Sequence, residues 1–521
     1  MRSMTHENIG RWPTIDLSSY ISSLRESLTD YAARARQSAS AVAGHIRGKR
    51  DREYPALEAF ARLNRKDGPH PLAAFVPAAY GGRGQKTAEC LSVLEELSYT
   101  SLPLSLIAGI NGALFLQPLA RYGSAELQQE VYHNVISNAA LSGLMITEPD
   151  FGSDALSMQT SFTETEGGYR LQGTKHWGGL TGHADYWLIT ARERSEDGRL
   201  GRNINFFVWD RESGGIEVEE YYQSLGLEEI PYGRNRIDTL VPAGRRLTPL
   251  ASGVRMLLDV LHRSRLQFPG MAMGFLRRIL DEAREHVTRR HVGGRPLGSY
   301  DQVRDRLAEI EAAYTTCSAM CAYTSEEASI DRDCSPLALP ANAIKTVVTD
   351  MMQAASQSLL QLTGAAGYRR DSYAGRAIVD CRPFQIFEGS NDILYEQVAE
   401  FVLKDMRRGG TSNLGAHLRS SELTRAAGAY LGDEVDVSLS APLPQRKLVM
   451  LGQALSRVVG MNMVATLGER GFNREMVTTT LAVLRRSIMR HLGSLAAPEI
   501  PGSGASLEDA SSWRGFLSPG V

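Results

Sequence analysis

The periodicity of the apolar residues changes twice along this 521-residue chain, and no other feature constrains its fold as strongly. From about residue 15 to residue 141, apolar residues recur at helical spacing, as at Leu91, Leu94 and Leu97. Short β-prone runs then replace this pattern, and helical spacing returns from about Gly253. We therefore expect a β-domain between two helical domains, in a fold of the α+β class that is mainly helical.

The β-prone runs are regularly spaced and separated by Gly, Asp and Pro turns. They cover residues 157–164, 169–173, 186–190, 204–209, 216–222 and 236–240. Short strands at such spacing predict a small antiparallel sheet or barrel. Because a strand that ends in Thr also opens this region, near residue 147, the β-domain begins at about residue 141.

The remaining helical patterns complete the expected domain organisation. Helices are predicted at residues 341–362, 447–467 and 474–492, a linker at 408–412, and a disordered or surface-wrapping tail from residue 496. A chain of this length is too long for one core. The domains that we expect are an N-terminal helical domain (1–140), a middle β-domain (141–250), a C-terminal helical bundle (251–407) and a helical C-terminal extension with a flexible tail (408–521).

Composition excludes several classes of function. The net charge is −2 and no Lys/Arg-rich run occurs, which argues against nucleic acid as a partner. The five cysteines are few and scattered, which favours a reducing cytoplasm over a disulfide framework. Cys317 and Cys321 would share a helix face, but without a nearby pair of histidines they favour a core position, so we expect no metal site.

Targeting and membrane signals are also not expected. The first twelve residues are polar and lack the apolar core of a signal peptide, and no apolar run is expected to reach membrane-spanning length. The two C-terminal helices are amphipathic. They either bind a membrane surface or pack on the core or on another subunit, and the second use is the commoner one for such apolar faces.

One carboxylate has the neighbours of a general base. Glu388 lies between the apolar Phe387 and Gly389. An apolar wall raises the pKa of a carboxyl group, and glycine lets a ligand approach the backbone closely. The alternative is that Glu388 merely starts a helix, with Gly389 and Ser390 as N-terminal punctuation and Asp392 near the positive end of the dipole.

The segment around Glu388 resembles the Tyr-Glu-Gly-Thr block of acyl-CoA dehydrogenases, flavoproteins that oxidise acyl thioesters between the α and β carbons. The resemblance implies that Glu388 removes the α-proton while flavin N5 accepts the β-hydride. It further implies that Phe387 and Gly389 line the substrate site and that Ser390 and Asp392 lie next to the flavin.

Arg265 matches an arginine that the family commonly has near the start of a long helix, facing the active-site region, and the resemblance implies a substrate contact for it. Some family members carry the base immediately before this arginine. Ser264 occupies that position here, so the resemblance assigns the base to Glu388.

Two earlier blocks resemble family signatures. Residues 75–84 resemble the Pro-x-x-Tyr-Gly-Gly-x-Gly loop of the N-terminal domain. Residues 145–154 resemble Thr-Glu-Pro-x-x-Gly-Ser-Asp, although an ordinary strand and turn would read the same way. The second resemblance implies cofactor contacts at the following positions: Met145, Ile146, Thr147 and Ser153. It also places Ser153 near the pantetheine or phosphate portion of the thioester.

Residues 173–179 resemble the Gly-Thr-Lys-x-Trp/Phe-Ile-Thr/Ser block, in which the aromatic residue packs on the isoalloxazine ring. Trp177 matches that residue, and a large aromatic ring suits stacking on a flavin. At position 179 the family has a hydroxyl that bonds the flavin, whereas this chain has Gly179. The missing contact implies either a changed redox potential or room for a different substrate.

Two later blocks point to the far end of the cofactor. Residues 289–297 resemble Arg-x-x-Phe-Gly-Arg/Lys-Pro-Leu, which implies that Arg290 pairs with the FAD diphosphate of a neighbouring subunit; a solvated basic helix end is the alternative. The usual Phe is Gly293 here. Gln361, Gly364 and Ala365 resemble Gln-x-x-Gly-Gly-x-Gly, which touches FAD across a dimer interface.

The resemblance extends over residues 70–405. It implies FAD as cofactor, and oxidation of acyl-CoA to trans-2-enoyl-CoA in fatty acid metabolism, or of an acyl-carrier-protein thioester. The electron acceptor would be an electron-transfer flavoprotein or oxygen, and the assembly a homodimer or homotetramer. Two alternatives stay open: a flavin monooxygenase or oxidase on the same fold, favoured by Gly179 and disfavoured by Glu388, and a catalytically silent flavin-bound interaction protein.

Overall fold

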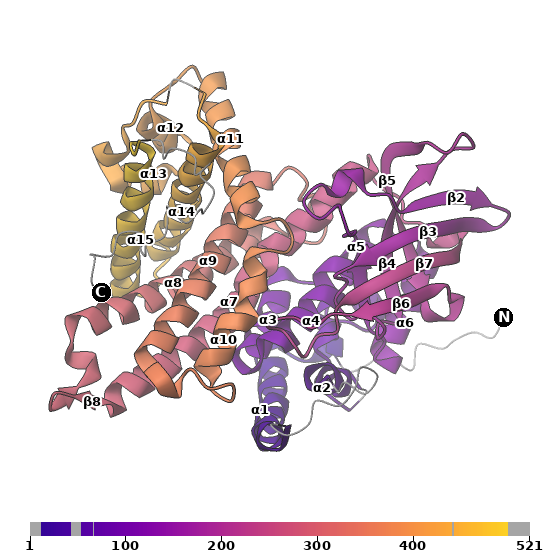
Figure 1. Cartoon of the computed structure of the whole chain (residues 1–521), viewed down its shortest axis with the longest axis horizontal. Helices are drawn as coiled ribbons and strands as arrows, with labels where there is room; N and C mark the ends of the chain where they lie inside the picture. The colour runs from indigo at the N-terminus through magenta and orange to yellow at the C-terminus, as the bar shows by residue number, and fades with distance from the viewer. Residues whose placement is uncertain (1–11, 43–53, 66, 440–441, 499–521) are drawn as a thin grey trace, which may run out of the picture.

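The computed structural model describes residues 12–42, 54–65, 67–439 and 442–498. Figure 1 shows the sheet at one end of the molecule, the N-terminal helices beside it, and the later helices at the opposite end. The N-terminal helices are α1 (Leu17–Val42), α2 (Pro55–Leu63), α3 (Thr87–Thr100), α4 (Leu102–Asn111), α5 (Gln117–Tyr122) and α6 (Ala125–Asn138). The prediction of a helical N-terminal region is confirmed within these residues.

The sheet has seven strands, and each of the six predicted β runs overlaps one of them. The strands are β1 (Ser142–Met145), β2 (Ser161–Thr165), β3 (Gly168–His176), β4 (Tyr186–Arg194), β5 (Leu200–Asp210), β6 (Ile216–Tyr221) and β7 (Gly233–Pro242). Their order is β1-β4-β2-β3-β7-β6, and β5 pairs with the other edge of β4.

The prediction of an antiparallel sheet or barrel holds for most strand pairs but is wrong for those that β1 and β2 make with β4. β1 and β2 both pair with β4 in parallel, while the remaining pairs are antiparallel. Parallel neighbours need a long crossover, and the β2–β3 hairpin lies between β1 and β4 in sequence and provides it. The short strand β1 therefore joins the sheet from the N-terminal helices and ends next to β3.

The long helix α7 (Gly253–Arg289) packs on α3 and on α9 and links the two ends of the molecule. A bundle is completed by α8 (Asp301–Glu327), α9 (Ala338–Thr363), α10 (Tyr373–Cys381) and α11 (Asn391–Arg408). The hairpin of β8 (His291–Val292) and β9 (Arg295–Pro296) joins α7 to α8 at the tip of the bundle.

The C-terminal extension contains α12 (Leu414–Ser420), α13 (Arg425–Leu431), α14 (Gln445–Glu469) and α15 (Arg474–Leu495). Both long helices that we predicted are confirmed, while α12 and α13 were not foreseen. The predicted linker is a tight turn, in which the Thr411 N–H donates to the Met406 carbonyl at 3.1 Å. Because α14 packs on α8, α9 and α11, and α15 on α8, the extension covers the core bundle. The predicted flexible tail falls mostly outside the described residues.

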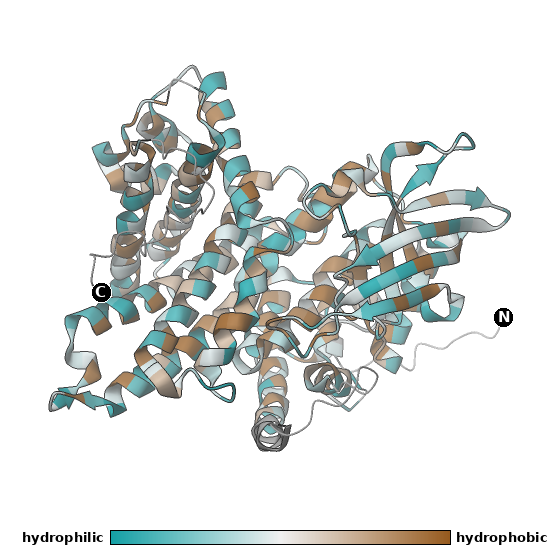
Figure 2. Cartoon of the chain, in the orientation of Figure 1, coloured by the Kyte–Doolittle hydropathy of each residue, from teal (hydrophilic) through white to brown (hydrophobic). Residues whose placement is uncertain are grey.

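Within the described part of the chain, two helical stretches are apolar and long enough to span a membrane, Leu102–Tyr122 and Gln445–Glu469. The expectation that no apolar run reaches this length was therefore wrong. Inside the protein, however, 94% and 67% of their most apolar windows are buried, which is the behaviour of core helices. Figure 2 shows hydrophobic residues concentrated in the middle of the molecule, around α3, α4 and α7.

Candidate active site

Glu388 lies in a backbone conformation that only external contacts can hold. Its φ is +54°, and the next residue, Gly389, has φ +94°. A residue with a Cβ in this left-handed region carries strain of about 1–2 kcal/mol. A Cβ on Gly389 would fall 3.1 Å from the Leu394 side chain, so glycine also suits the space. The turn before α11 therefore aims Glu388 at the cost of local strain.

Two buried cations bind the carbonyl groups of this turn. Arg265 Nε of α7 donates to the Glu388 carbonyl at 2.9 Å, and Lys345 Nζ of α9 donates to the Gly389 carbonyl at 2.8 Å. Both side chains are buried. Burial, and after it the nearby Arg265, lower the pKa of Lys345 to about 7. The turn is thus attached to two separate helices.

The Glu388 carboxylate has one bonded and one unbonded oxygen. Ser264 Oγ donates to Oε1 at 2.7 Å, whereas Oε2 has no hydrogen-bond partner among the described residues. Burial raises the pKa of Glu388, and this effect exceeds the lowering by Ser264, Arg265 and Lys345. A half-buried carboxylate with a raised pKa and a free oxygen is equipped to accept a proton.

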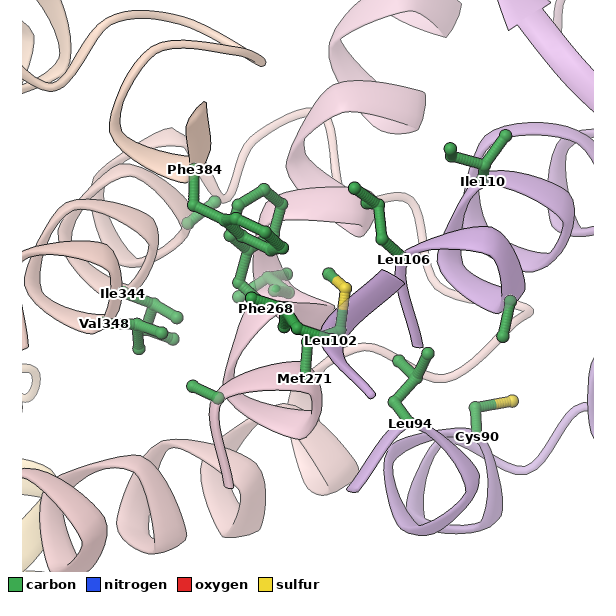
Figure 3. Close-up of a cluster of buried hydrophobic side chains, with 14 of the residues drawn as sticks. Cys90, Leu94, Leu102, Leu106, Ile110, Phe268, Met271, Ile344, Val348 and Phe384 are labelled. Carbon is green, nitrogen blue, oxygen red and sulfur yellow. The ribbon is translucent and has the colours of Figure 1, made fainter. Parts of the chain in front are cut away.

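An aromatic wall, which includes the preceding residue Phe387, lies next to the base. The ring of Phe384 lies 4.9 Å from that of Phe387 and 5.8 Å from that of Phe268. Figure 3 shows Phe384 and Phe268 in the same cluster as Leu106 of α4 and Met271 of α7. Burial is the physical cause of the raised pKa of Glu388.

The two flavin-type motifs of the β-domain lie side by side. The His176 N–H donates to the Thr147 carbonyl at 2.9 Å, which joins the turn after β1 to the end of β3. Thr147 is half-buried, and Met145 before it is fully buried. Trp177 follows with φ +57° and is 51% exposed.

Trp177 also belongs to an aromatic group that fits a planar ligand. Its ring lies 4.5 Å from that of Tyr222 and 6.0 Å from that of Tyr232. Large aromatic surface next to half-buried polar backbone is what a flat heteroaromatic ring system requires. The residues present therefore fit an isoalloxazine-like group.

Gly179 departs from the motif for a packing reason. A Cβ at this position would fall 2.5 Å from Ile110 Cδ1 and 3.4 Å from the Tyr232 ring. Ile110 is on α4, the helix that also carries Leu106 of the cluster beside Phe384. The space of the missing hydroxyl is already filled, so Gly179 opens no extra room for substrate at its Cβ position. α4 runs between the β-domain motifs and the wall at Glu388.

Three consecutive segments match the domains of one family. Residues 24–139 match the acyl-CoA dehydrogenase N-terminal domain, residues 143–240 the middle domain and residues 251–403 the C-terminal domain. The chain belongs to the acyl-CoA dehydrogenase family. Members of this family are oxidoreductases.

Curated relatives and solved structures of the family agree with this assignment. An acyl-CoA dehydrogenase of Bacillus subtilis is 25% identical over 386 residues, which is 73% of this chain and 97% of the relative. The probable acyl-CoA dehydrogenase FadE10 of Mycobacterium tuberculosis is 28% identical over 68% of this chain, which spans only 56% of that protein. A Bacillus anthracis acyl-CoA dehydrogenase complexed with FAD shares the fold, with a TM-score of 0.74, 17% identity and coverage of 94% and 89%.

Several residues that the family resemblance singled out do not join Glu388 within one chain. Arg290 is exposed at the end of α7, next to β8, and Figure 1 shows that hairpin at the opposite end of the molecule from the sheet. The other exposed positions are Ser153, Gln361, Gly364, Ala365 and Asp392. Their predicted roles stay predictions, as do substrate contacts by Phe387 and Arg265.

Sequence reasoning missed part of this family member's site. Ser264 was noted only because it is not a carboxylate, and Lys345, Asp350 and Asn391 were not noted at all. Helix α9 carries the buried polar residues Asn342, Lys345 and Thr349 at helical spacing. Buried polar residues at this spacing need partners, and that signal was available in the sequence.

We expect Gly179→Ala to lower the free energy of unfolding by about 1–3 kcal/mol, because the added methyl overlaps Ile110 in a packed region. Ile110→Val removes the overlapping Cδ1 atom, so the double variant should regain most of the loss. Urea denaturation of the four proteins measures the coupling. Strict additivity of the two single changes would contradict the contact.

Proposed function

We propose that this chain is an FAD-dependent dehydrogenase of acyl thioesters in which Glu388 removes the α-proton. The observation that carries the proposal is the Glu388 carboxylate, which is half-buried next to an aromatic wall with Oε2 unbonded. A base must combine a raised pKa with a free lone pair that faces the substrate. Ser264 supports this role because its bond to Oε1 fixes the plane of the carboxylate.

The residues proposed to hold FAD are Met145, Ile146, Thr147 and Trp177. The support is the exposed face of Trp177 next to the half-buried Thr147, in a family whose solved members include an FAD complex. When bound, FAD supplies the acceptor for the β-hydride. The chain itself orients the thioester between Trp177 and Glu388 and keeps water from the base with the Phe384 and Phe387 rings.

We also propose a homo-oligomer. The other residues that the family resemblance assigns to FAD have no neighbours within this chain that would require these residue types. Arg290, Gln361 and Gly364 are exposed, and a Cβ at Gly364 would meet no atom within 4 Å. A second subunit that places its FAD against them would account for all three. We propose an electron-transfer flavoprotein or oxygen as acceptor and the cytoplasm as location; the latter agrees with five free cysteines, four of them buried.

The test is anaerobic addition of saturated acyl-CoA thioesters of increasing chain length to the purified protein, followed by the flavin absorbance. Bleaching of oxidised flavin by one class of chain length supports the proposal and names that class. Bound flavin that no acyl-CoA reduces would reject acyl-CoA as substrate, and carrier-protein thioesters would be tested next. A protein purified without flavin that also fails to bind added FAD would contradict the proposal.

The rate of flavin reduction should rise with pH through the raised pKa of Glu388, because only the carboxylate form accepts the α-proton. Burial raises this pKa above the ordinary 4.5, while the Ser264 hydrogen bond lowers it. Ser264→Ala removes the lowering contribution, so the midpoint of the profile should move to higher pH. Stopped-flow reduction at several pH values measures it, and a midpoint that moves to lower pH would contradict the assignment.

A further inference from the structure

We propose that Arg457 of the C-terminal extension positions the catalytic turn by holding Asp350, so that the extension is part of the active site's support. The inference deepens the proposed function, because it takes Glu388 as the base. Arg457 is on α14, and the match to the family's C-terminal domain ends at residue 403. A residue outside the family's catalytic domains would therefore act on the reacting carboxylate through another side chain.

Asp350 holds both ends of the turn with one carboxylate oxygen. Its Oδ1 accepts a hydrogen bond from Gln385 Nε2 at 2.7 Å and another from Asn391 Nδ2 at 2.9 Å. Gln385 and Asn391 lie three residues before and three residues after Glu388. A single atom of α9 thus closes the segment that carries the strained Glu388.

A second connection runs from Asp350 into the turn itself. Asn391 accepts a hydrogen bond from Lys345 Nζ through Oδ1 at 2.9 Å. Lys345 also donates to the Gly389 carbonyl, directly after Glu388. Asp350, Asn391 and Lys345 therefore form a continuous chain of hydrogen bonds that ends at the backbone of Gly389, directly after the base.

Arg457 binds the oxygen of Asp350 that faces away from the turn. Its Nη2 donates to Oδ2 at 3.1 Å, and its Nη1 donates to the Tyr395 hydroxyl at 3.4 Å and to the Gln453 carbonyl at 3.0 Å. Tyr395 in turn donates to the same Oδ2 at 2.6 Å. The side chains of Arg457 and Asp350 are only 13% and 22% exposed.

Arg457 is the cation that compensates Asp350. The neighbouring His491 of α15 stays neutral near pH 7, because burial and then Arg457 lower its pKa to about 4. Lys345 bonds Asn391 and Gly389 rather than Asp350. Arg457 is the only cation bonded to Asp350 among the residues that the structure describes. A mostly buried carboxylate that loses its bonded cation draws water or turns its oxygens, and either change loosens the hold on Gln385 and Asn391.

The test compares Arg457→Met with Arg470→Met in the flavin-loaded protein. Arg470 directly follows α14 and also joins the extension to the core, by an exposed ion pair with Glu326 of α8. Hydrogen exchange of residues 384–394 should be about tenfold faster in Arg457→Met and unchanged in Arg470→Met. Loss of a hydrogen bond to a buried charge raises the equilibrium constant for local opening by about one to two powers of ten. This readout does not depend on the reaction.

The kinetic arm separates positioning from binding. Arg457→Met should lower the limiting rate of flavin reduction by about tenfold, with little change in the KM for the thioester. A misplaced Glu388 carboxylate destabilises the transition state more than it weakens ground-state binding of the thioester. Arg457→Lys keeps the charge and should restore part of the rate. If wild-type flavin is reduced by no thioester, the proposed function fails, while the exchange measurement still decides this inference.

Three results would overturn the inference. One is a rate of hydrogen exchange of residues 384–394 that is the same in Arg457→Met as in Arg470→Met. Another is faster exchange spread evenly over α8, α9 and α14, which would show general loosening. If Arg457→Met does not fold, Asp350→Ala takes its place, because it removes the oxygen that accepts the Gln385 and Asn391 hydrogen bonds. Unchanged exchange of residues 384–394 in that variant would be the third.

Discussion

Glu388→Gln is expected to reduce the rate of thioester-dependent flavin reduction by about 10²–10⁴-fold, the usual contribution of a positioned general base. The amide keeps the shape of the side chain, and its oxygen can accept the Ser264 hydrogen bond now made to Oε1. It cannot take up the α-proton at the position of Oε2. Anaerobic stopped-flow with a saturating substrate measures the loss directly.

The control is Glu400→Gln, an exposed glutamate farther along α11. It makes the same chemical change and should leave the rate unaltered. Both variants should keep the wild-type flavin spectrum, because neither residue belongs to the proposed flavin contacts. A Glu388→Gln protein that retains more than a tenth of the wild-type rate would remove Glu388 from the role of base.

Lys175→Met is expected to lower the free energy of unfolding by about 3–5 kcal/mol, because it leaves a buried carboxylate without its cation. Lys175 is fully buried, and its Nζ donates to Glu148 Oε1 at 2.8 Å and to the Ile146 carbonyl at 3.0 Å. These bonds join the turn after β1 to β3, which carries Trp177 at its end. The free energy of unfolding, measured by denaturation, and the affinity for FAD should therefore both change.

Lys86→Met is the matched control for this change. Lys86 also pairs with a glutamate, Glu89, but its side chain is 71% exposed. Such a pair contributes about 0–1 kcal/mol. The double variant Lys175→Met/Glu148→Gln removes the orphan charge and should regain part of the stability. A Lys175→Met protein as stable as Lys86→Met would show that the buried pair of Lys175 and Glu148 does not stabilise the fold.

Much of the helix and strand content could be predicted because each element carries its own periodicity. The long helices α14 and α15 and all six β runs were found in this way. Strand pairing could not be found, because the residues of β4 do not encode whether β1 joins it in parallel. That pairing depends on the crossover made by the intervening hairpin.

The residues of the candidate site likewise divide into those that could be located from the sequence and those that could not. Glu388, Thr147 and Trp177 were located because each lies in a short contiguous motif, and the structure places Thr147 next to the end of β3. Ser264 and Lys345 were missed because they contact Glu388 and its neighbour from other helices. The meaning of Gly179 was also hidden, since the side chain that fills its space is Ile110 of α4.

By itself, then, the sequence determined the alternation of helical and β segments, the family, and the local motifs that identify Glu388 and Trp177 as candidate site residues. These properties depend on neighbours within a few residues along the chain. Only the tertiary structure decided what holds the base. Arg265, Lys345 and Asp350 come from α7 and α9, and Arg457 from an extension about seventy residues beyond Glu388. The reason is physical: a strained turn is kept in place by hydrogen bonds to distant segments, and such bonds leave no periodic trace in the sequence.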